Sequence, residues 1–139
     1  MIINPITNGI VLDHITAGLG MKLYRILGLD KLDCAVAIIE RADSVKLGKK
    51  DIIKIDRVID FSFDVIGYVD PGVTVNVIKD GKLYKRDKIG LPETVTDIIQ
   101  CKNPRCITSV EPGLTHVFKL CDREHRTYRC IYCDSVSEQ

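Results

Sequence analysis

The sequence predicts an α+β protein. We expect a ferredoxin-like α/β sandwich, with an antiparallel sheet and two helices on one face, followed by a small all-β domain that holds zinc through four cysteines. Three observations lead to this prediction. Strand-like and helix-like segments alternate in the order β-α-β-β-α-β-β before residue 91, and Asp80-Gly81 is a strong signal for a two-residue hairpin turn. Four cysteines then follow in two close pairs. An antiparallel sheet covered on one face is the economical way to bury such segments.

The first strand and helix are predicted near the N-terminus. Residues 10–12 form a short apolar strand, and Thr16 is a suitable cap for a helix over residues 17–27. Leucine and isoleucine side chains recur on one face of that helix at helical spacing, and Gly28 ends it.

The remaining elements of the sandwich follow from β-branched runs and turn residues. Strands are predicted where such residues cluster, and a short helix is predicted before the turn Asp70-Pro71-Gly72. The predicted strands are residues 33–40, 51–59, 73–79 and 82–86, the helix is residues 61–68, and residues 46–50 form a basic loop.

Composition narrows the class of protein. The chain has 139 residues, 45% of them hydrophobic and 28% charged, with a net charge of +1, so its overall charge does not attract it to nucleic acid or membrane. Residues 1–5 lack the basic and apolar regions of a signal peptide, and no apolar run approaches the roughly 18 residues of a membrane span. Paired thiols without an export signal indicate the cytoplasm. The character of the sequence changes near residue 91, which predicts domains over residues 1–92 and 93–139.

The four cysteines have the spacing of a structural zinc site. Cys101-x4-Cys106 is separated by 23 residues from Cys130-x2-Cys133. Each pair is expected to lie on a tight turn that directs two sulfur atoms at one point about 2.3 Å from the metal. Four thiolates leave Zn²⁺ no open position, so one structural zinc per chain is predicted. The alternatives are a redox dithiol or a pair of disulfides. Two further cysteines lie outside the pattern: Cys34, interpreted as a small buried hydrophobe, and Cys121, to which we assign no role.

The N-terminal segment offers no catalytic set, because its one histidine, His14, has no neighbouring Ser or Cys to activate. Asp13 and His14 lie between a strand and a helix, where they either contact a ligand or cap the helix. Lys54 faces away from its isoleucine neighbours and is either solvated or part of a pocket for an anionic ligand. Asn76 is unusual inside a strand, which indicates an exposed face or a specific hydrogen bond.

Together these segments resemble the regulatory chain of aspartate carbamoyltransferase, and the resemblance covers nearly the whole chain. Matching stretches occur in the family's order, and the 23-residue cysteine spacer agrees as well. These stretches are residues 6–15, 48–55, 73–78, 91–92, 101–107 and 130–133.

The resemblance implies a non-catalytic regulatory subunit in pyrimidine biosynthesis. It implies that residues 1–92 bind the nucleotide effectors CTP and ATP, with UTP as a further candidate, and pair into a homodimer. It also implies that the zinc domain, residues 93–139, docks on a separate catalytic chain, with Asn103, Arg105 and the loop 111–113 as candidate contacts. In the family, two catalytic trimers are held by three regulatory dimers, and CTP inhibits while ATP activates.

The resemblance also implies a set of effector-binding residues. Asp13 and Lys54 match positions that contact base, ribose or triphosphate, and His14 lies beside the phosphates. Arg86 stands where the family has a second phosphate-binding lysine, and Gly81 stands where the family has an aromatic residue. The positions that line the pocket are Ile6, Val11, Ile52, Asn76 and Ile78.

Two other functions compete with this interpretation. A zinc-ribbon protein that binds nucleic acid is suggested by local basic residues in the cysteine module, but acidic residues interleave with them and the chain has no Trp for base stacking. The basic residues are Arg105, Lys119, Arg123, Arg126 and Arg129. A stand-alone enzyme would need a nucleophile with an acid or base beside it, which the sequence does not provide.

Overall fold

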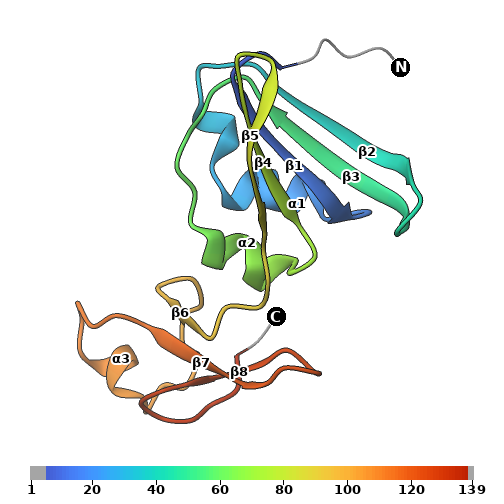
Figure 1. The fold of residues 1–139 in the computed structure, drawn as a ribbon. Helices are drawn as coiled ribbons and strands as arrows, with labels where there is room; N and C mark the ends of the chain where they lie inside the picture. Colours follow the sequence, from blue (N-terminus) through green and yellow to red (C-terminus); the bar gives the residue numbers. More distant parts are fainter. Residues whose placement is uncertain (1–5, 138–139) are drawn as a thin grey trace. The chain divides into compact units, whose positions relative to one another are not determined.

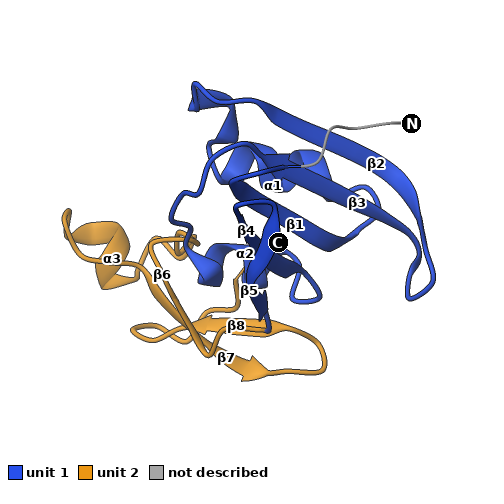
Figure 2. Ribbon diagram, turned by 45° about the horizontal axis from the view of Figure 1, so that its top comes forward, with its two compact units in different colours: residues 1–90 blue, residues 91–139 orange. Residues whose placement is uncertain are grey.

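The structure is a computed structural model that describes residues 6–137. The chain divides into two compact units, residues 1–90 (unit 1) and residues 91–139 (unit 2), coloured separately in Figure 2. Residues 1–5, from which we predicted the absence of a signal peptide, lie outside the described residues.

Within residues 6–90, five strands form one antiparallel sheet in the order β2-β3-β1-β4-β5. The elements alternate as the sequence predicts, and Figure 1 shows the helices packed beside the sheet. The α+β class is therefore confirmed. The strands are β1 (Gly9–Thr16), β2 (Val36–Ser44), β3 (Gly48–Ile55), β4 (Thr74–Lys79) and β5 (Lys82–Lys88), and the helices are α1 (Gly20–Ile26), the 3₁₀ turn η1 (Leu29–Lys31) and α2 (Phe63–Val69).

One face of this sheet forms the core of unit 1. Alternate residues of the central strands are fully buried and pack in a single cluster with side chains from the helices. Because side chains alternate along a strand, the residues between them lie on the opposite face, which we call the outer face of the sheet. The core residues are Ile10, Leu12, Ile15, Leu23, Leu29, Ile53, Ile55, Ile66, Val73 and Val75.

The start of α1 differs from the prediction. Thr16 does not cap the helix: it is the last residue of β1, and its backbone N–H and hydroxyl both lie within hydrogen-bonding distance of the Asp70 carboxylate. The helix begins four residues later, with Leu19 at its N-cap and no side-chain cap. The strand is longer than expected because it continues through a β-bulge, in which Asp13 and His14 together lie opposite Ile52.

Asp51 joins the strands to the helix segment. Its carboxylate is fully buried and accepts hydrogen bonds from the backbone N–H groups of Gly18, Gly20 and Arg41, at 3.0, 2.9 and 2.9 Å. Arg41 lies in a second bulge, in β2, with a φ of 57°. The side chain of Asp51 also fills the space that a Cβ at Gly20 would need, at 2.9 Å. Asp51 therefore fixes both the bulged strand and the start of α1.

Replacing Asp51 with alanine is expected to lower the free energy of unfolding of unit 1 by at least about 3 kcal/mol, because three backbone donors lose a charged acceptor at a buried site. Chemical denaturation monitored by circular dichroism measures this. The control is Asp43→Ala, which removes an exposed ion pair with Lys49 and is expected to leave the stability nearly unchanged. Equal stability of the two variants would contradict this role for Asp51.

Within residues 91–137, three strands form an antiparallel sheet in the order β6-β7-β8. They are β6 (Thr94–Thr96), β7 (Val117–Asp122) and β8 (Thr127–Cys130), and a one-turn helix, α3 (Ile107–Val110), lies between β6 and β7 in the chain (Figure 1). Val95, Phe118 and Tyr128 are buried, and the Tyr128 hydroxyl donates to the carbonyl oxygen of Pro92. Among the described residues, no helix is long and apolar enough to cross a bilayer.

Candidate metal centre and outer face of the sheet

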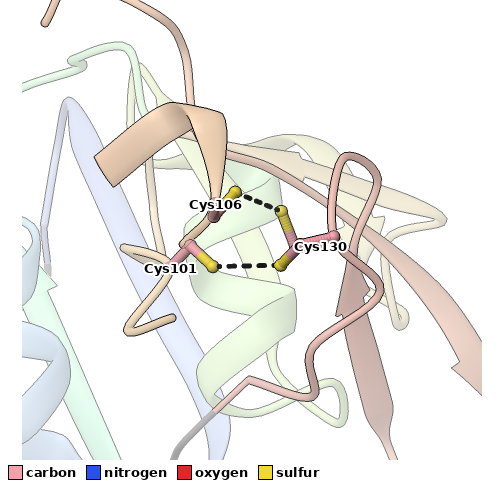
Figure 3. Close-up of side chains that lie close together, drawn as sticks. Cys101, Cys106 and Cys130 are labelled. Carbon is pink, nitrogen blue, oxygen red and sulfur yellow. Dashed lines mark hydrogen bonds between the residues drawn. The ribbon is translucent and has the colours of Figure 1, made fainter. Parts of the chain in front are cut away.

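The four predicted cysteine ligands meet at one point in unit 2. All four sulfur atoms lie within 4.8 Å of one another, and the thiols are free rather than paired in disulfides. Figure 3 shows the sulfur atoms of Cys101, Cys106 and Cys130 turned toward a common centre. The Sγ atoms of Cys101 and Cys133 are 3.5 Å apart, and those of Cys106 and Cys130 are 3.7 Å apart.

These distances fit a tetrahedral metal site. Four sulfur ligands at about 2.3 Å from a central ion lie about 3.8 Å from one another, whereas a disulfide would bring two of them to about 2.05 Å. In the described chain, the metal-ligand cluster contains the four cysteines without a histidine or carboxylate. The arrangement therefore fits a closed four-thiolate site, and a closed site has a structural role.

Two turns hold the sulfur atoms in place. In the first, the side-chain oxygen of Asn103 accepts from the Arg105 N–H at 3.1 Å, and its carbonyl oxygen accepts from the Cys106 N–H at 3.1 Å. Asn103, a predicted contact for another chain, is thus occupied within its own turn. In the second turn, Cys130 ends β8 and its carbonyl oxygen accepts from the Asp134 N–H at 2.9 Å.

Burial and hydroxyl groups divide the four thiols into two kinds. Burial raises the pKa of the Cys101 thiol to about 12, and burial also raises the pKa of Cys130. Hydrogen bonds with hydroxyl groups act in the other direction: Ser135 lowers the pKa of Cys133 to about 6, and Thr108 lowers the pKa of Cys106. The hydroxyls lie 3.2 Å from the Cys133 sulfur and 3.0 Å from the Cys106 sulfur.

The two histidines of unit 2 lie outside the cluster. His116 approaches it only through the backbone, because its Nδ1 lies 3.2 Å from the N–H of Cys101. His125 lies on the β7–β8 turn, 2.8 Å from the Asp122 carboxylate. Among the described residues, the cluster that could hold a metal ion therefore consists of the four cysteines alone, and their role as metal ligands stays a prediction.

The outer face of the unit 1 sheet carries the predicted effector residues. Lys54 in β3, Val11 in β1, Asn76 in β4 and Arg86 in β5 are successive cross-strand partners, so they form one row across four strands. Asn76 is buried and connects the row: its amide nitrogen donates to the Val11 carbonyl oxygen at 3.3 Å, and its amide oxygen accepts from Arg86 Nε at 2.9 Å. The row has a cation at each end.

The next row on the same face contains the β1 bulge. Asp13 pairs with Thr74, and the Nδ1 atom of His14 lies 3.2 Å from the Thr74 hydroxyl. Lys50 lies 2.9 Å from the Asp13 carboxylate. Burial alone would raise the pKa of Asp13, but hydrogen bonds from the Lys50 ammonium and the His14 N–H outweigh it and lower that pKa below its usual value. Asp13 is therefore ionised, and the Lys50 ammonium compensates its charge. Its carboxylate accepts a hydrogen bond from the backbone N–H of His14 and so helps to fix the position of that residue.

The apolar members of the predicted pocket surround these rows. Ile52 lies opposite the Asp13–His14 bulge, and Ile78 pairs with Gly9 at the other end of β1. A Cβ at Gly9 would come within 2.7 Å of the Ile6 side chain, so Ile6 lies against that glycine. All nine predicted effector positions thus lie on or beside the outer face, and their role in binding stays a prediction.

Several residues of these sites were not predicted from the sequence. The sequence predicts Lys50 in a basic loop, but β3 begins at Gly48 and Lys50 lies within it. The sequence assigns Thr74 no role beyond its place in a predicted strand. Thr108 and Ser135 were missed, although each stands two positions after the second cysteine of its pair. That shared spacing is the sequence signal that identifies them.

Comparison with known proteins assigns a family to both units. Residues 1–90 match the family model described as the allosteric domain of the aspartate carbamoyltransferase regulatory chain, and residues 93–139 match the one described as its metal binding domain. Unit 2 is thus a metal-binding domain.

Relatives that carry the name of this family match along nearly their whole length. The aspartate carbamoyltransferase regulatory chain of Clostridium botulinum strain Hall is 48% identical over 134 residues, which cover 96% of this chain and 92% of the relative. The chain of the same name from Clostridium tetani is 48% identical over 135 residues, with 96% and 94% covered. That of Bifidobacterium longum is 42% identical over 138 residues, with 99% of both chains covered. The protein therefore belongs to the aspartate carbamoyltransferase regulatory chains, and it is a regulatory chain rather than a catalytic one.

Proposed function

We propose that this chain controls aspartate carbamoyltransferase in pyrimidine biosynthesis in the cytoplasm. Unit 1 binds the nucleoside triphosphates CTP and ATP, and UTP as a third effector, while unit 2 docks on the catalytic chain. The nucleic-acid alternative is not favoured, because both units match a regulatory-chain family.

The observation that carries the nucleotide proposal is the row of cross-strand partners on the outer face. Lys54 and Arg86 stand at its ends, three strands apart, which is about 14 Å at the backbone. Both side chains are long enough to converge on one triphosphate. Arg86 is directed along the row by its hydrogen bond to Asn76. A guanidinium offers phosphate a planar pair of donors, which suits a position where orientation is already fixed.

The other residues of the outer face contact different parts of the nucleotide. Val11 and Ile52 offer apolar surface for a base, while Asp13 and His14 offer hydrogen-bonding groups for ribose and phosphate. Since Lys50 neutralises Asp13, the carboxylate does not repel a neighbouring phosphate as a free charge would. His14 is held toward Thr74 and needs little reorganisation to reach a ligand.

We propose Zn²⁺ as the metal of unit 2. Four thiolates at tetrahedral spacing are the donor set that zinc prefers for structural sites, and the paired sulfur distances of 3.5 and 3.7 Å agree with it. When bound, the ion supplies a rigid crosslink between the two turns and carries out no chemistry on a substrate. Cys101, Cys106, Cys130 and Cys133 hold it.

The turns around the metal provide an apolar surface for the catalytic chain. Four apolar side chains on α3 and between the last two cysteines are about half exposed or more. The exposed fractions are 50% for Ile107, 65% for Val110, 52% for Ile131 and 48% for Tyr132. Exposed apolar side chains on so small a domain favour burial against a partner. The exposed Arg105 and the exposed loop 111–113 lie on the same stretch of chain and supply polar contacts at its rim.

The sheet of unit 1 supports pairing of two regulatory chains. β2 is an edge strand, and the tip of the β2–β3 hairpin exposes Val45 fully and Leu47 by 45%. An unpaired strand edge with apolar residues at its end favours pairing with a second copy. One such dimer would then bridge two catalytic trimers.

The experiment is reconstitution with the aspartate carbamoyltransferase catalytic chain of the same organism. Size-exclusion chromatography with light scattering is expected to give one assembly containing both chains, larger than the catalytic trimer. Persistence of separate peaks at micromolar concentration would contradict the docking proposal. Binding of oligonucleotides that weakens steeply with salt would instead support the nucleic-acid alternative.

A further inference from the structure

The two metal-binding turns end in the same way. Cys106 is followed by Ile107-Thr108 and Cys133 by Asp134-Ser135, so each pair of cysteines has a hydroxyl residue two positions after its second member. The Thr108 hydroxyl lies 3.0 Å from the Cys106 sulfur, and the Ser135 hydroxyl lies 3.2 Å from the Cys133 sulfur. In the structure the Cys133 thiol donates to the Ser135 hydroxyl oxygen, and either group can be the donor between Cys106 and Thr108. A thiolate that binds a metal has no proton to give, so in the loaded site these hydrogen bonds form with the hydroxyls as donors.

The four sulfur ligands differ in how accessible they are. Cys101, Cys106 and Cys130 are buried, with exposed fractions of 7%, 1% and 1%, whereas Cys133 is only half-buried. A reagent from solvent therefore reaches Cys133 before the other three ligands. The most accessible sulfur is also the one that the Ser135 hydroxyl contacts.

We infer that Ser135 is a positioning residue that protects the sulfur of Cys133, the most accessible of the four ligands, and so sets how fast electrophiles remove the metal from unit 2. This inference rests on the proposed four-thiolate metal site. A hydrogen bond to a metal-bound thiolate draws electron density from sulfur, which makes the sulfur a weaker nucleophile. The hydroxyl also holds the Cys133 side chain toward the other ligands.

The backbone of Ser135 is held in the turn by a hydrogen bond that does not depend on its side chain. The carbonyl oxygen of Ser135 accepts from the Cys130 N–H at 2.9 Å, a contact that does not involve the hydroxyl. Removing only the hydroxyl therefore leaves this turn anchored. Thr108, in contrast, is 7% exposed and the Cys106 residue whose sulfur it contacts is 1% exposed, so Thr108 does not face the route of attack.

Iodoacetamide is a suitable probe of this protection. The Cys133 sulfur attacks the methylene carbon, an S–C bond forms, the C–I bond breaks and iodide leaves with the bonding electrons. The resulting thioether is a neutral, weak ligand, so the sulfur–metal bond is lost and the metal is released. Alkylation of Cys121 or Cys34 does not affect this readout, because neither belongs to the cluster.

The experiment measures metal release from the full chain with a chromophoric indicator under excess iodoacetamide. Ser135→Ala is expected to carry one metal per chain, like the parent, and to release it about threefold to tenfold faster. Ser135→Thr is expected to restore the slow rate because it keeps the hydroxyl. The matched control is Ser137→Ala: Ser137 lies two positions further on, its backbone N–H is bonded to the Tyr128 carbonyl oxygen, and it is expected to release metal at the parent rate.

Mass spectrometry at the onset of release identifies the first ligand alkylated, which is expected to be Cys133. Equal release rates for Ser135→Ala and the parent, or first alkylation at Cys101, Cys106 or Cys130, would overturn the inference while leaving the metal site intact. Parent protein without bound metal would overturn the metal site and the inference together.

Discussion

Replacing Cys106 with serine is expected to leave the chain without its metal and to unfold residues 101–133 while unit 1 stays folded. Cys106 is 1% exposed and is the N-cap residue of α3, and its sulfur lies 3.7 Å from the Cys130 sulfur. Structural zinc contributes roughly 10–16 kcal/mol to thiolate-bound modules of this kind, far more than so small a core can replace. The core of unit 1 does not depend on the metal.

Two measurements on the same sample test this. Metal analysis is expected to fall from one zinc per chain to a small fraction, and hydrogen exchange is expected to become fast in unit 2 alone. Cys121→Ser is the matched control, because Cys121 is exposed on β7 and outside the cluster, so it should retain both metal and protection. Undiminished zinc in Cys106→Ser would refute the ligand assignment.

Replacing Lys54 with alanine is expected to weaken CTP binding about tenfold or more. A charge-assisted hydrogen bond to phosphate contributes roughly 1.5–3 kcal/mol, and Lys54 is the cation at the β3 end of the outer-face row. The substitution leaves the core face of β3 untouched, because Ile53 and Ile55 point to the other side of the sheet. The loss should therefore appear in affinity and not in stability.

Isothermal titration calorimetry with CTP measures the effect, and thermal denaturation without nucleotide checks the fold. Lys119→Ala is the control, because it removes an exposed lysine from β7 in unit 2 and leaves the outer face unchanged. If Lys54→Ala bound CTP as tightly as the parent protein, the proposed effector site would be wrong.

Local patterns explain why most of the fold could be predicted. The alternating isoleucines of β3 determine which side chains enter the core, and Asp80-Gly81 fixes the β4–β5 hairpin. The bulges at His14 and Arg41 could not be predicted, because they depend on how β1 and β2 pair with β3 around the buried Asp51. Because β1 continues through the bulge at His14, Thr16 belongs to the strand and α1 begins only at Gly20.

The metal centre was more predictable than the outer face. Cysteine spacing identifies the ligands directly, since each pair lies on one short turn. The row from Lys54 to Arg86 joins residues from four strands, and periodicity along one strand does not give the register between strands. The resemblance to the regulatory chains indicated which positions to consider. The strand register then shows that Lys54, Val11, Asn76 and Arg86 are cross-strand neighbours.

The central proposal is that nucleotide binding in unit 1 reaches a catalytic partner through a metal-stabilised unit 2. Nucleotides can alter catalysis only as far as their affinity differs between two states of the assembly, typically by about 1–3 kcal/mol. The direct measurement is aspartate carbamoyltransferase activity of the reconstituted assembly, titrated with CTP and ATP before and after metal removal by a chelator. Before removal, activity is expected to depend on nucleotide; afterwards, free catalytic trimers should be active and unresponsive. A metal-free chain that still assembled and still transmitted the nucleotide effect would contradict the proposal.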